Sequence, residues 1–142
     1  MTHRAENILK AVEDKMNVLF ETLYEVQRDR LHPPERYPAL SITQGSETPV
    51  ETLSSGFQDA LLAISINIYV KELDYSTRLN KIKAEVYNAM LKDHTLGLSY
   101  VIDTTWEGDE APELISELEQ GALVCSMNFV CQYRHSYISK ES

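Results

Sequence analysis

The segment from Phe57 to Thr105 constrains the fold more than any other part of this chain of 142 residues. Apolar residues alternate with polar ones over 58–71, recur every three or four residues over 75–93, and alternate again from position 99. A period of two is typical of a half-buried strand, and a period near 3.6 of an amphipathic helix. The segment therefore predicts a strand, a helix laid across the sheet, and a second strand.

The strand predicted over Gln58 to Lys71 has one apolar and one small, polar face. The apolar face comprises Ala60, Leu62, Ile64, Ile66, Ile68 and Val70. The opposite face comprises Ala63, Ser65, Asn67, Tyr69 and Lys71. Such alternation is typical of a sheet that is packed on one side only.

The helix predicted over Tyr75 to Asp93 is punctuated at both ends. It should bury Leu79, Ile82, Val86, Ala89 and Met90. Asp74 or Ser76 can cap its start, and Gly97 suits the left-handed residue that closes a helix end.

An earlier helix is predicted over Ala5 to Arg30. Its apolar stripe comprises Ile8, Val12, Met16, Leu19, Leu23 and Val26, at steps of three and four residues. Pro33 and Pro34 cannot continue a helix and therefore end it.

Three further strands are predicted over Ala39 to Thr43, Ser99 to Trp106 and Ala122 to His135. On the middle one, Tyr100 and Trp106 share a face and are expected in the core. On the last one, Leu123, Cys125, Met127, Phe129, Cys131 and Tyr133 form the packed face. Six residues of strand span roughly 20 Å, so the two cysteines are too far apart for a disulfide and are expected as reduced core residues.

Two long loops are predicted, over Gln44 to Gly56 and Glu107 to Gln120. Long loops without internal structure often bind partners, which makes the first loop a candidate binding segment. The alternative is a crossover between strands that has no function of its own. The second belongs to an acidic stretch without Lys or Arg that comprises Asp103, Glu107, Asp109, Glu110, Glu113, Glu117 and Glu119. It lacks the spacing and central glycine of a calcium loop, which favours a solvated or partner-facing segment.

Together these patterns predict an α+β fold with a small mixed or antiparallel sheet of about four strands and two main helices on one face. We expect one domain over residues 1–142, with a folded core over 5–135 and a polar tail over 136–142. The formal net charge is −9. This charge argues against a protein whose main affinity is for nucleic acid, although it can also serve solubility alone.

No targeting or membrane segment is expected. No run of about 18 apolar residues is present, and Met1 to Arg4 leads into an amphipathic pattern rather than a signal peptide. The reduced cysteines indicate folding in a cytoplasm.

The sequence carries no recognisable catalytic, cofactor or metal motif. None of the four histidines has a second ligand at metal spacing, and no phosphate-binding glycine loop or nucleophile set is present. Asp93 and His94 form an acid–base pair or, more simply, a helix cap. We therefore expect a protein that is not an enzyme and that binds no cofactor and no metal. Two long loops and open sheet edges instead favour binding to partners and to further copies of the chain.

The order of elements resembles the tail terminator, or tail completion, proteins of long-tailed bacteriophages. The resemblance covers roughly residues 5–135. It is carried by the leading helix, the short strand and polar loop of residues 38–47, the alternating strand 63–70, the helix end at 90–98 and the last strand ending at 128–134.

The resemblance implies a ring of six copies on the head-proximal end of the virion tail, made in the host cytoplasm. Such a ring stops polymerisation of the tail tube protein and docks to head-completion or neck proteins, while genome DNA passes without specific binding. The residues expected to contact partners or line the lumen are Gln44, Ser46, Glu47, Glu51, Glu107, Asp109, Glu110, Glu113, Glu117 and Glu119.

Other functions are open on the sequence alone. A head-completion or minor tail protein belongs to the same class. A small-ligand-binding or regulatory α+β domain predicts a monomer or dimer with a concave apolar pocket. A hydrolase that uses Asp93 and His94 is the third alternative.

Overall fold

A central twisted sheet with both helices on one face forms the architecture. The computed structural model describes residues 3–19, 25–28, 38–50, 56–71, 75–114 and 123–136. The helices are α1 (Arg4–Leu19) and α2 (Tyr75–Lys92). The strands are β1 (Glu25–Arg28), β2 (Ala39–Val50), β3 (Phe57–Val70), β4 (Val101–Asp109), β5 (Glu113–Leu114) and β6 (Leu123–Ser136).

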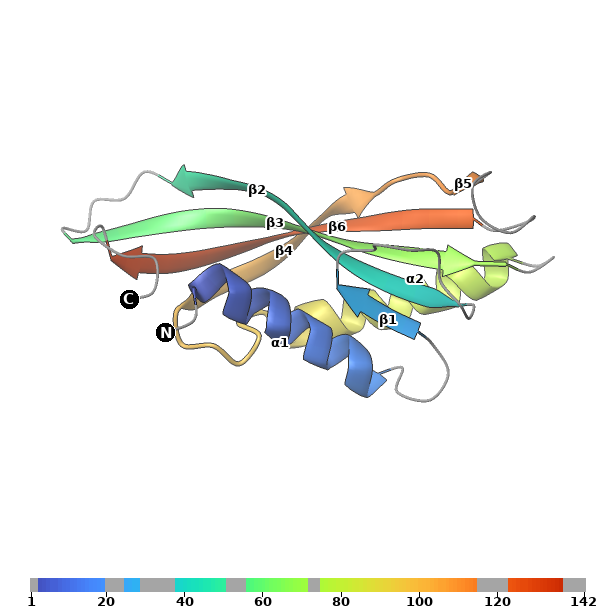
Figure 1. The fold of residues 1–142 in the computed structure, drawn as a ribbon, viewed down its shortest axis with the longest axis horizontal. Coiled ribbons are helices and arrows are strands. Elements are labelled where there is room, and N and C mark those ends of the chain that lie inside the picture. Colours follow the sequence, from blue (N-terminus) through green and yellow to red (C-terminus); the bar gives the residue numbers. More distant parts are fainter. Residues whose placement is uncertain are drawn as a thin grey trace.

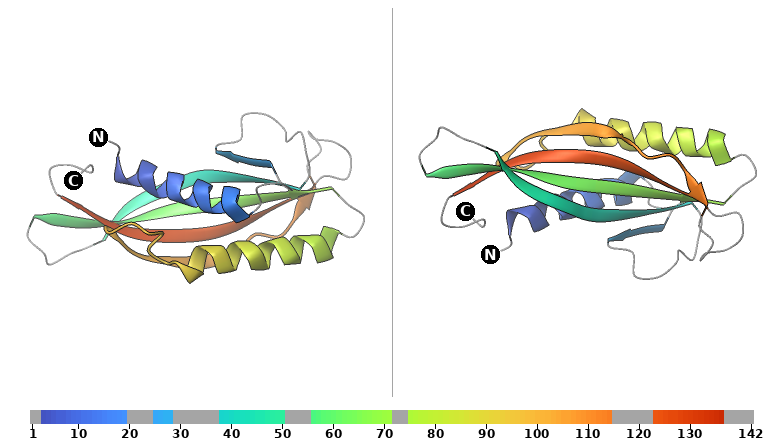
Figure 2. Two further views of the ribbon diagram at one scale, coloured as in Figure 1. Left: turned by 90° about the horizontal axis from the view of Figure 1, so that it is seen from below. Right: turned by 90° about the horizontal axis from the view of Figure 1, so that it is seen from above.

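The sheet has six strands in the order β1-β2-β3-β6-β4, with β5 paired to β6. The β1–β2 pair is parallel, and all other pairs are antiparallel. The predicted mixed sheet is therefore correct in kind but wrong in size, since about four strands were expected. Both helices cover the same face, as predicted, and run in opposite directions across it (Figures 1 and 2).

The core lies between this face and the helices. All six residues of the predicted apolar face of β3 are buried, and α1 and α2 bury Ile8, Val12, Met16, Leu79, Ile82, Val86 and Met90 against it. On β6 the residues from Cys125 to Tyr133 on the predicted face are buried, while Leu123 is partly buried. Both cysteines are free and buried, as predicted.

The first helix is shorter than predicted. It ends at Leu19 rather than Arg30, and Val26, assigned to its stripe, lies in β1 and packs partly buried against the core. The step of three residues from Leu23 to Val26 is compatible with a helix but does not require one. Residues of β1 instead form a strand, which pairs with Ala39–Ile42 of β2. The predicted stop at Pro33 and Pro34 lies outside the described residues.

Both predicted loops contain strand: the described part of the first is strand up to Val50, and the second contributes residues 107–109 and 113–114 to strands. β2 continues from Thr43 to Val50 through a bulge between Gln44 and Glu47. β4 continues past Trp106 to Asp109, and β5 follows at Glu113. Trp106 is 45% exposed rather than buried, because it lies at the edge of the sheet with its ring edge-on to Tyr87 of α2.

The end of α2 is close to the predicted one. Gly97 has a φ of 71° and Leu96 a φ of 55°, so two successive left-handed residues turn the chain from the helix toward β4. The capping side chains proposed at positions 74 and 76 lie outside the described side chains. Within the described part of the chain, no helix is long and apolar enough to cross a membrane.

Candidate interaction surfaces

The sheet face opposite the helices carries a ladder of neutral hydrogen bonds. Ser65 Oγ donates to Asn128 Oδ1 at 2.9 Å, and Ser126 Oγ donates to Asn67 Oδ1 at 2.6 Å. Asn67 Nδ2 in turn donates to Thr43 Oγ1 at 3.0 Å. These side chains satisfy one another across β2, β3 and β6, which explains the small polar residues without invoking a reaction.

The residues of the first predicted loop separate into exposed and anchored ones. Gln44 and Ser46 are exposed on the bulged part of β2. Glu47 instead accepts a hydrogen bond from the hydroxyl of Tyr133. Burial, together with this neighbouring carboxylate, raises the pKa of Tyr133 above its ordinary value. Glu47 is therefore partly engaged with the core, and Gln44 and Ser46 remain available to a partner.

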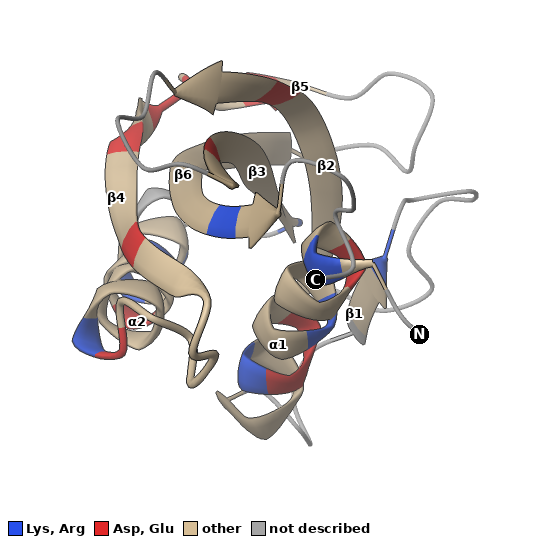
Figure 3. Cartoon of the chain, turned by 90° about the vertical axis from the view of Figure 1, so that its left-hand side faces the viewer, with Lys and Arg blue, Asp and Glu red and all other residues tan. Residues whose placement is uncertain are grey.

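The acids of the second predicted loop also differ in their surroundings. Asp109 lies 2.9 Å from Lys83 Nζ and accepts a hydrogen bond from Trp106 Nε1 at 2.8 Å, so it ties β4 to α2. Glu107, Glu110 and Glu113 are exposed, and none has a cationic partner among the described residues. Figure 3 shows acidic positions along β4. We call Glu107, Glu110 and Glu113 the acidic end.

Glu51, Glu117 and Glu119, also predicted to face partners, lie outside the described residues. The structure thus brings Glu107, Glu110 and Glu113 together at one end of β4 and β5. It separates them from Gln44 and Ser46, which lie across the sheet on β2.

Two edges of the sheet are open among the described strands. β1 covers β2 only at Ala39–Ile42, so the part of β2 from Thr43 to Val50 has no strand on its outer side. β4 ends the strand order on the other side. Unpaired strand edges are templates for pairing with another chain.

A small pocket of about 280 Å³ lies where α1 begins and β4 leaves the turn. It is lined by Arg4, Phe57, Ser99, Tyr100, Ile102 and Arg134. The Arg4 guanidinium lies 4.4 Å from the centre of the Tyr100 ring, and its Nη1 donates to the Arg134 carbonyl at 2.6 Å. We call this the arginine pocket. Reasoning from the sequence did not identify it, because Arg4 and Arg134 meet only in the folded chain.

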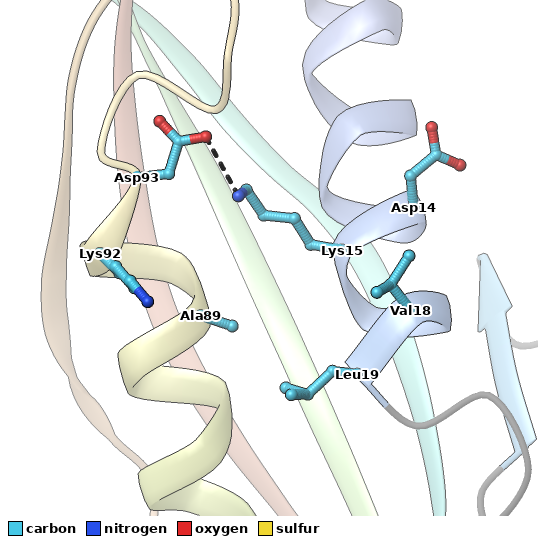
Figure 4. Close-up of a pocket in the computed structure, with 7 residues that line it drawn as sticks. All are labelled: Asp14, Lys15, Val18, Leu19, Ala89, Lys92 and Asp93. Carbon is cyan, nitrogen blue, oxygen red and sulfur yellow. Dashed lines mark hydrogen bonds and ion pairs between the residues drawn. The ribbon is translucent and has the colours of Figure 1, made fainter.

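A wider groove of about 640 Å³ separates the ends of the two helices. Figure 4 shows Leu19 of α1 pointing toward Ala89 of α2 across it, with a salt bridge between Lys15 Nζ and Asp93 Oδ2 at 3.2 Å. The hydrogen bond from Lys15 lowers the pKa of Asp93. Val18 is 76% exposed, so the groove is shallow there.

The described residues do not form a recognisable constellation of catalytic side chains. Asp93 binds Lys15, whereas His94 Nδ1 lies 3.1 Å from Asp103 Oδ1, so the two members of the predicted acid–base pair have different partners. Burial raises the pKa of Cys131 to about 11, which keeps this thiol protonated and unreactive at neutral pH. Within the described ranges, no group of three or more His, Cys, Asp or Glu side chains can hold a metal ion.

The fold itself has counterparts among solved structures. No protein-family model matches the chain, and no curated protein matches it. A chain of the structure "Virion of native gene transfer agent (GTA) particle" matches with a TM-score of 0.62 at 11% sequence identity. The match covers 90% of this chain and 95% of that chain. At this level of identity it shows a shared fold over nearly the full length of both chains.

Proposed function

We propose that this protein is a structural component of a phage-like virion, and more specifically a tail terminator. In this role six copies form a ring on the head-proximal end of the tail tube. The ring stops polymerisation of the tube protein, docks to a head-completion or neck protein, and lets the genome pass through its bore. The protein performs no catalysis in this role.

The observation that carries the proposal is the shared fold with a chain of a gene transfer agent virion. Because the match covers 95% of that chain, the correspondence is with a whole subunit rather than with a fragment of a larger protein. The helix, strand, strand, helix, strand, strand order that resembles the tail terminators is present in the structure as α1, β2, β3, α2, β4 and β6, with β1 and β5 added to it.

The described surfaces fit assembly better than catalysis. Two open sheet edges and an exposed acidic end provide places for neighbouring subunits, whereas the buried thiols and paired carboxylates offer no nucleophile or base. The net charge of −9 also suits a bore that DNA must cross, because phosphate affinity comes from cationic contacts.

A capping reaction tests the proposal. Purified protein is added to growing tubes of the cognate tail tube protein, and tube lengths and ends are counted by negative-stain electron microscopy. We expect a sixfold ring on one end of each tube and arrest of growth at that end. Ile66→Asp, which places a charge in the core, should abolish capping and serves as the fold-dependent control.

A compact monomer that binds neither end of the tube would overturn the proposal, and so would turnover abolished by one side-chain replacement. The groove between the helices favours a second candidate, a small-ligand-binding domain. That function predicts that an apolar ligand raises the melting temperature of the wild type but not of Val18→Asp, while tube growth is unaffected.

A further inference from the structure

The two ends of β4 carry opposite chemistry. The arginine pocket lies beside Val101, where the strand starts, and the acidic end begins at Glu107, where it finishes. In the register of β4 with β6, Val101 lies opposite Tyr133 and Asp109 opposite Met127, which places the two ends of β4 roughly 20 Å apart. Figure 1 shows β4 crossing the sheet obliquely and leading on to β5, so the two features lie toward different ends of this strand.

The arginine pocket holds a cation that lacks an anion. Among the described residues, Arg134 pairs with Asp59 at 2.8 Å, but no carboxylate lies within ion-pair distance of Arg4. Within the described part of the chain, the Arg4 guanidinium contacts the carbonyl of Arg134 and the face of the Tyr100 ring. A guanidinium has five N–H donors in a fixed fork, so Arg4 retains donors for a carboxylate.

The surroundings of Arg4 are those of an interface rather than of a solvated cation. Phe57 is 46% exposed and Ile102 is 41% exposed at the rim of the pocket. The Tyr100 hydroxyl is buried and has no hydrogen-bond partner within the described part of the chain. An arginine held by an aromatic ring and flanked by apolar side chains is typical of the centre of a protein–protein contact.

The acidic end carries carboxylates without cations to pair with them in the described structure. Lys83, the cation of α2 that pairs with β4, is bound to Asp109. Glu107 on one side of Asp109, and Glu110 and Glu113 on the other, have no cation among the described residues. One copy cannot join its own pocket to its own acidic end, because β4 holds them apart. A second copy can.

We propose that the arginine pocket of one copy receives the acidic end of the next copy, head to tail. This inference rests on the proposed function, since it names the contact between neighbouring copies in the ring. The contact is heterologous, with different surfaces on the two sides, and repeats of such a contact form a closed ring or a filament. Arg4 binds the glutamates while Phe57 and Ile102 exclude water around the ion pairs.

A charge exchange tests the contact with the full chain. Variant A carries Arg4→Glu, and variant B carries Glu107→Lys, Glu110→Lys and Glu113→Lys. Each variant alone sets like charges against each other, so we expect its association constant to fall at least tenfold in sedimentation velocity. An equimolar mixture restores both contacts, each between an A and a B copy, and should recover assemblies in which A and B alternate.

The matched control is Lys81→Glu, which reverses an exposed cation on α2 outside the pocket. At an ionic strength of about 0.15 M, where long-range repulsion is largely screened, it should associate nearly as the wild type does. Circular dichroism of A and B checks that each is folded, and recovery in the mixture excludes misfolding as the cause of their dissociation.

Assemblies of A alone and B alone that match the wild type would overturn the contact, as would a mixture that stays monomeric. The proposed function fails separately. If the wild type caps tubes and A and B also cap them, only this interface is contradicted. If the wild type never binds a tube end, the proposed capping ring itself is contradicted.

Discussion

At the scale of single residues, the buried carboxylate of Asp59 anchors the end of the β3–β6 pair. Its oxygens accept hydrogen bonds from Arg134 Nε at 2.8 Å and from Gln132 Nε2 at 3.2 Å. The Arg134 hydrogen bond lowers the pKa of Asp59 from its ordinary value of 3.8, although burial opposes this shift. A carboxyl whose pKa is lowered by folding stabilises the protein above its unfolded pKa, and this stability is lost as the pH falls through the folded pKa.

Replacing this residue by Asp59→Asn should therefore lower the free energy of unfolding at neutral pH by about 1–2 kcal/mol. The difference from the wild type should shrink as the pH falls through the lowered pKa of Asp59, because the carboxyl of the folded protein then becomes protonated. Urea unfolding followed by circular dichroism at about pH 7 and about pH 3 measures both values. Asp14→Asn, at an exposed position on α1, is the control. A difference that is unchanged by acid would contradict the assignment.

Single side chains also show what the sequence can predict. The alternation over β3 correctly assigned Ile64 to the core and Ser65 to the opposite face, since strand geometry fixes that choice locally. The arginine pocket was missed because its hydrogen bond joins residues 130 positions apart. No local periodicity in the sequence indicates a contact between residues so far apart.

At the scale of elements, β2 shows how a strand can resemble a loop. The Gly, Ser, Thr and Pro residues after Thr43 lack an apolar period, yet the chain pairs with β3 as far as Val50. The bulge between Gln44 and Glu47 changes which side chains face the core, so simple alternation is lost. Gly45 lies so close to β3 that a Cβ placed on it would be 2.9 Å from the Cβ of Ala63.

Gly45→Ala should destabilise the protein by about 1–3 kcal/mol, because two methyl groups would overlap. Adding Ala63→Gly removes one of them and should recover part of the loss. The recovery is incomplete because the Ala63 carbonyl oxygen remains 3.3 Å from the new Cβ. Thermal unfolding of both single variants and the double variant gives the coupling energy. Ser46→Ala is the neighbouring control, and purely additive effects would contradict the close approach.

The other element-level errors have a similar origin. Helical spacing through Leu23 and Val26 agrees with a long first helix. The pairing of β1 with β2 is a contact between separate segments, and local spacing does not reveal such a contact. The long acidic stretch also hides β5, whose two residues pair with β6 although neither side chain is buried. Hydrophobic periodicity detects strands that pack against a core and misses those held mainly by backbone pairing.

At the scale of the whole molecule, the α+β class and the common face of the helices were predictable, because each follows from amphipathic segments. The number of strands was not, since the added ones lie at the edges of the sheet. The net charge is equally visible in the sequence, but its division between the acidic end and the arginine pocket emerges only on folding.

This charge distribution predicts an unusual response to salt. Copies with a net charge of −9 repel one another over long distances, while the proposed ion pairs act at contact. Raising ionic strength from about 0.01 M to about 0.15 M shortens the Debye length from about 30 Å to about 8 Å, which screens the repulsion more than the contact. Self-association should therefore strengthen over this range in sedimentation velocity.

Lys81→Glu replaces a positive by a negative charge outside the pocket, which makes the net charge more negative by two, and should make the rise with salt steeper. Association that weakens steadily from the lowest salt would show that long-range repulsion does not limit assembly.

Because β4 separates two unlike contact surfaces, every partial arc of copies would keep one unused pocket and one unused set of glutamates. Growth then stops only when the last copy binds the first. The rotation between successive copies therefore sets the number of copies in the closed ring. A change of a few degrees in how α1 presents Arg4 beside Tyr100 would alter the bore, with no change in which residues touch.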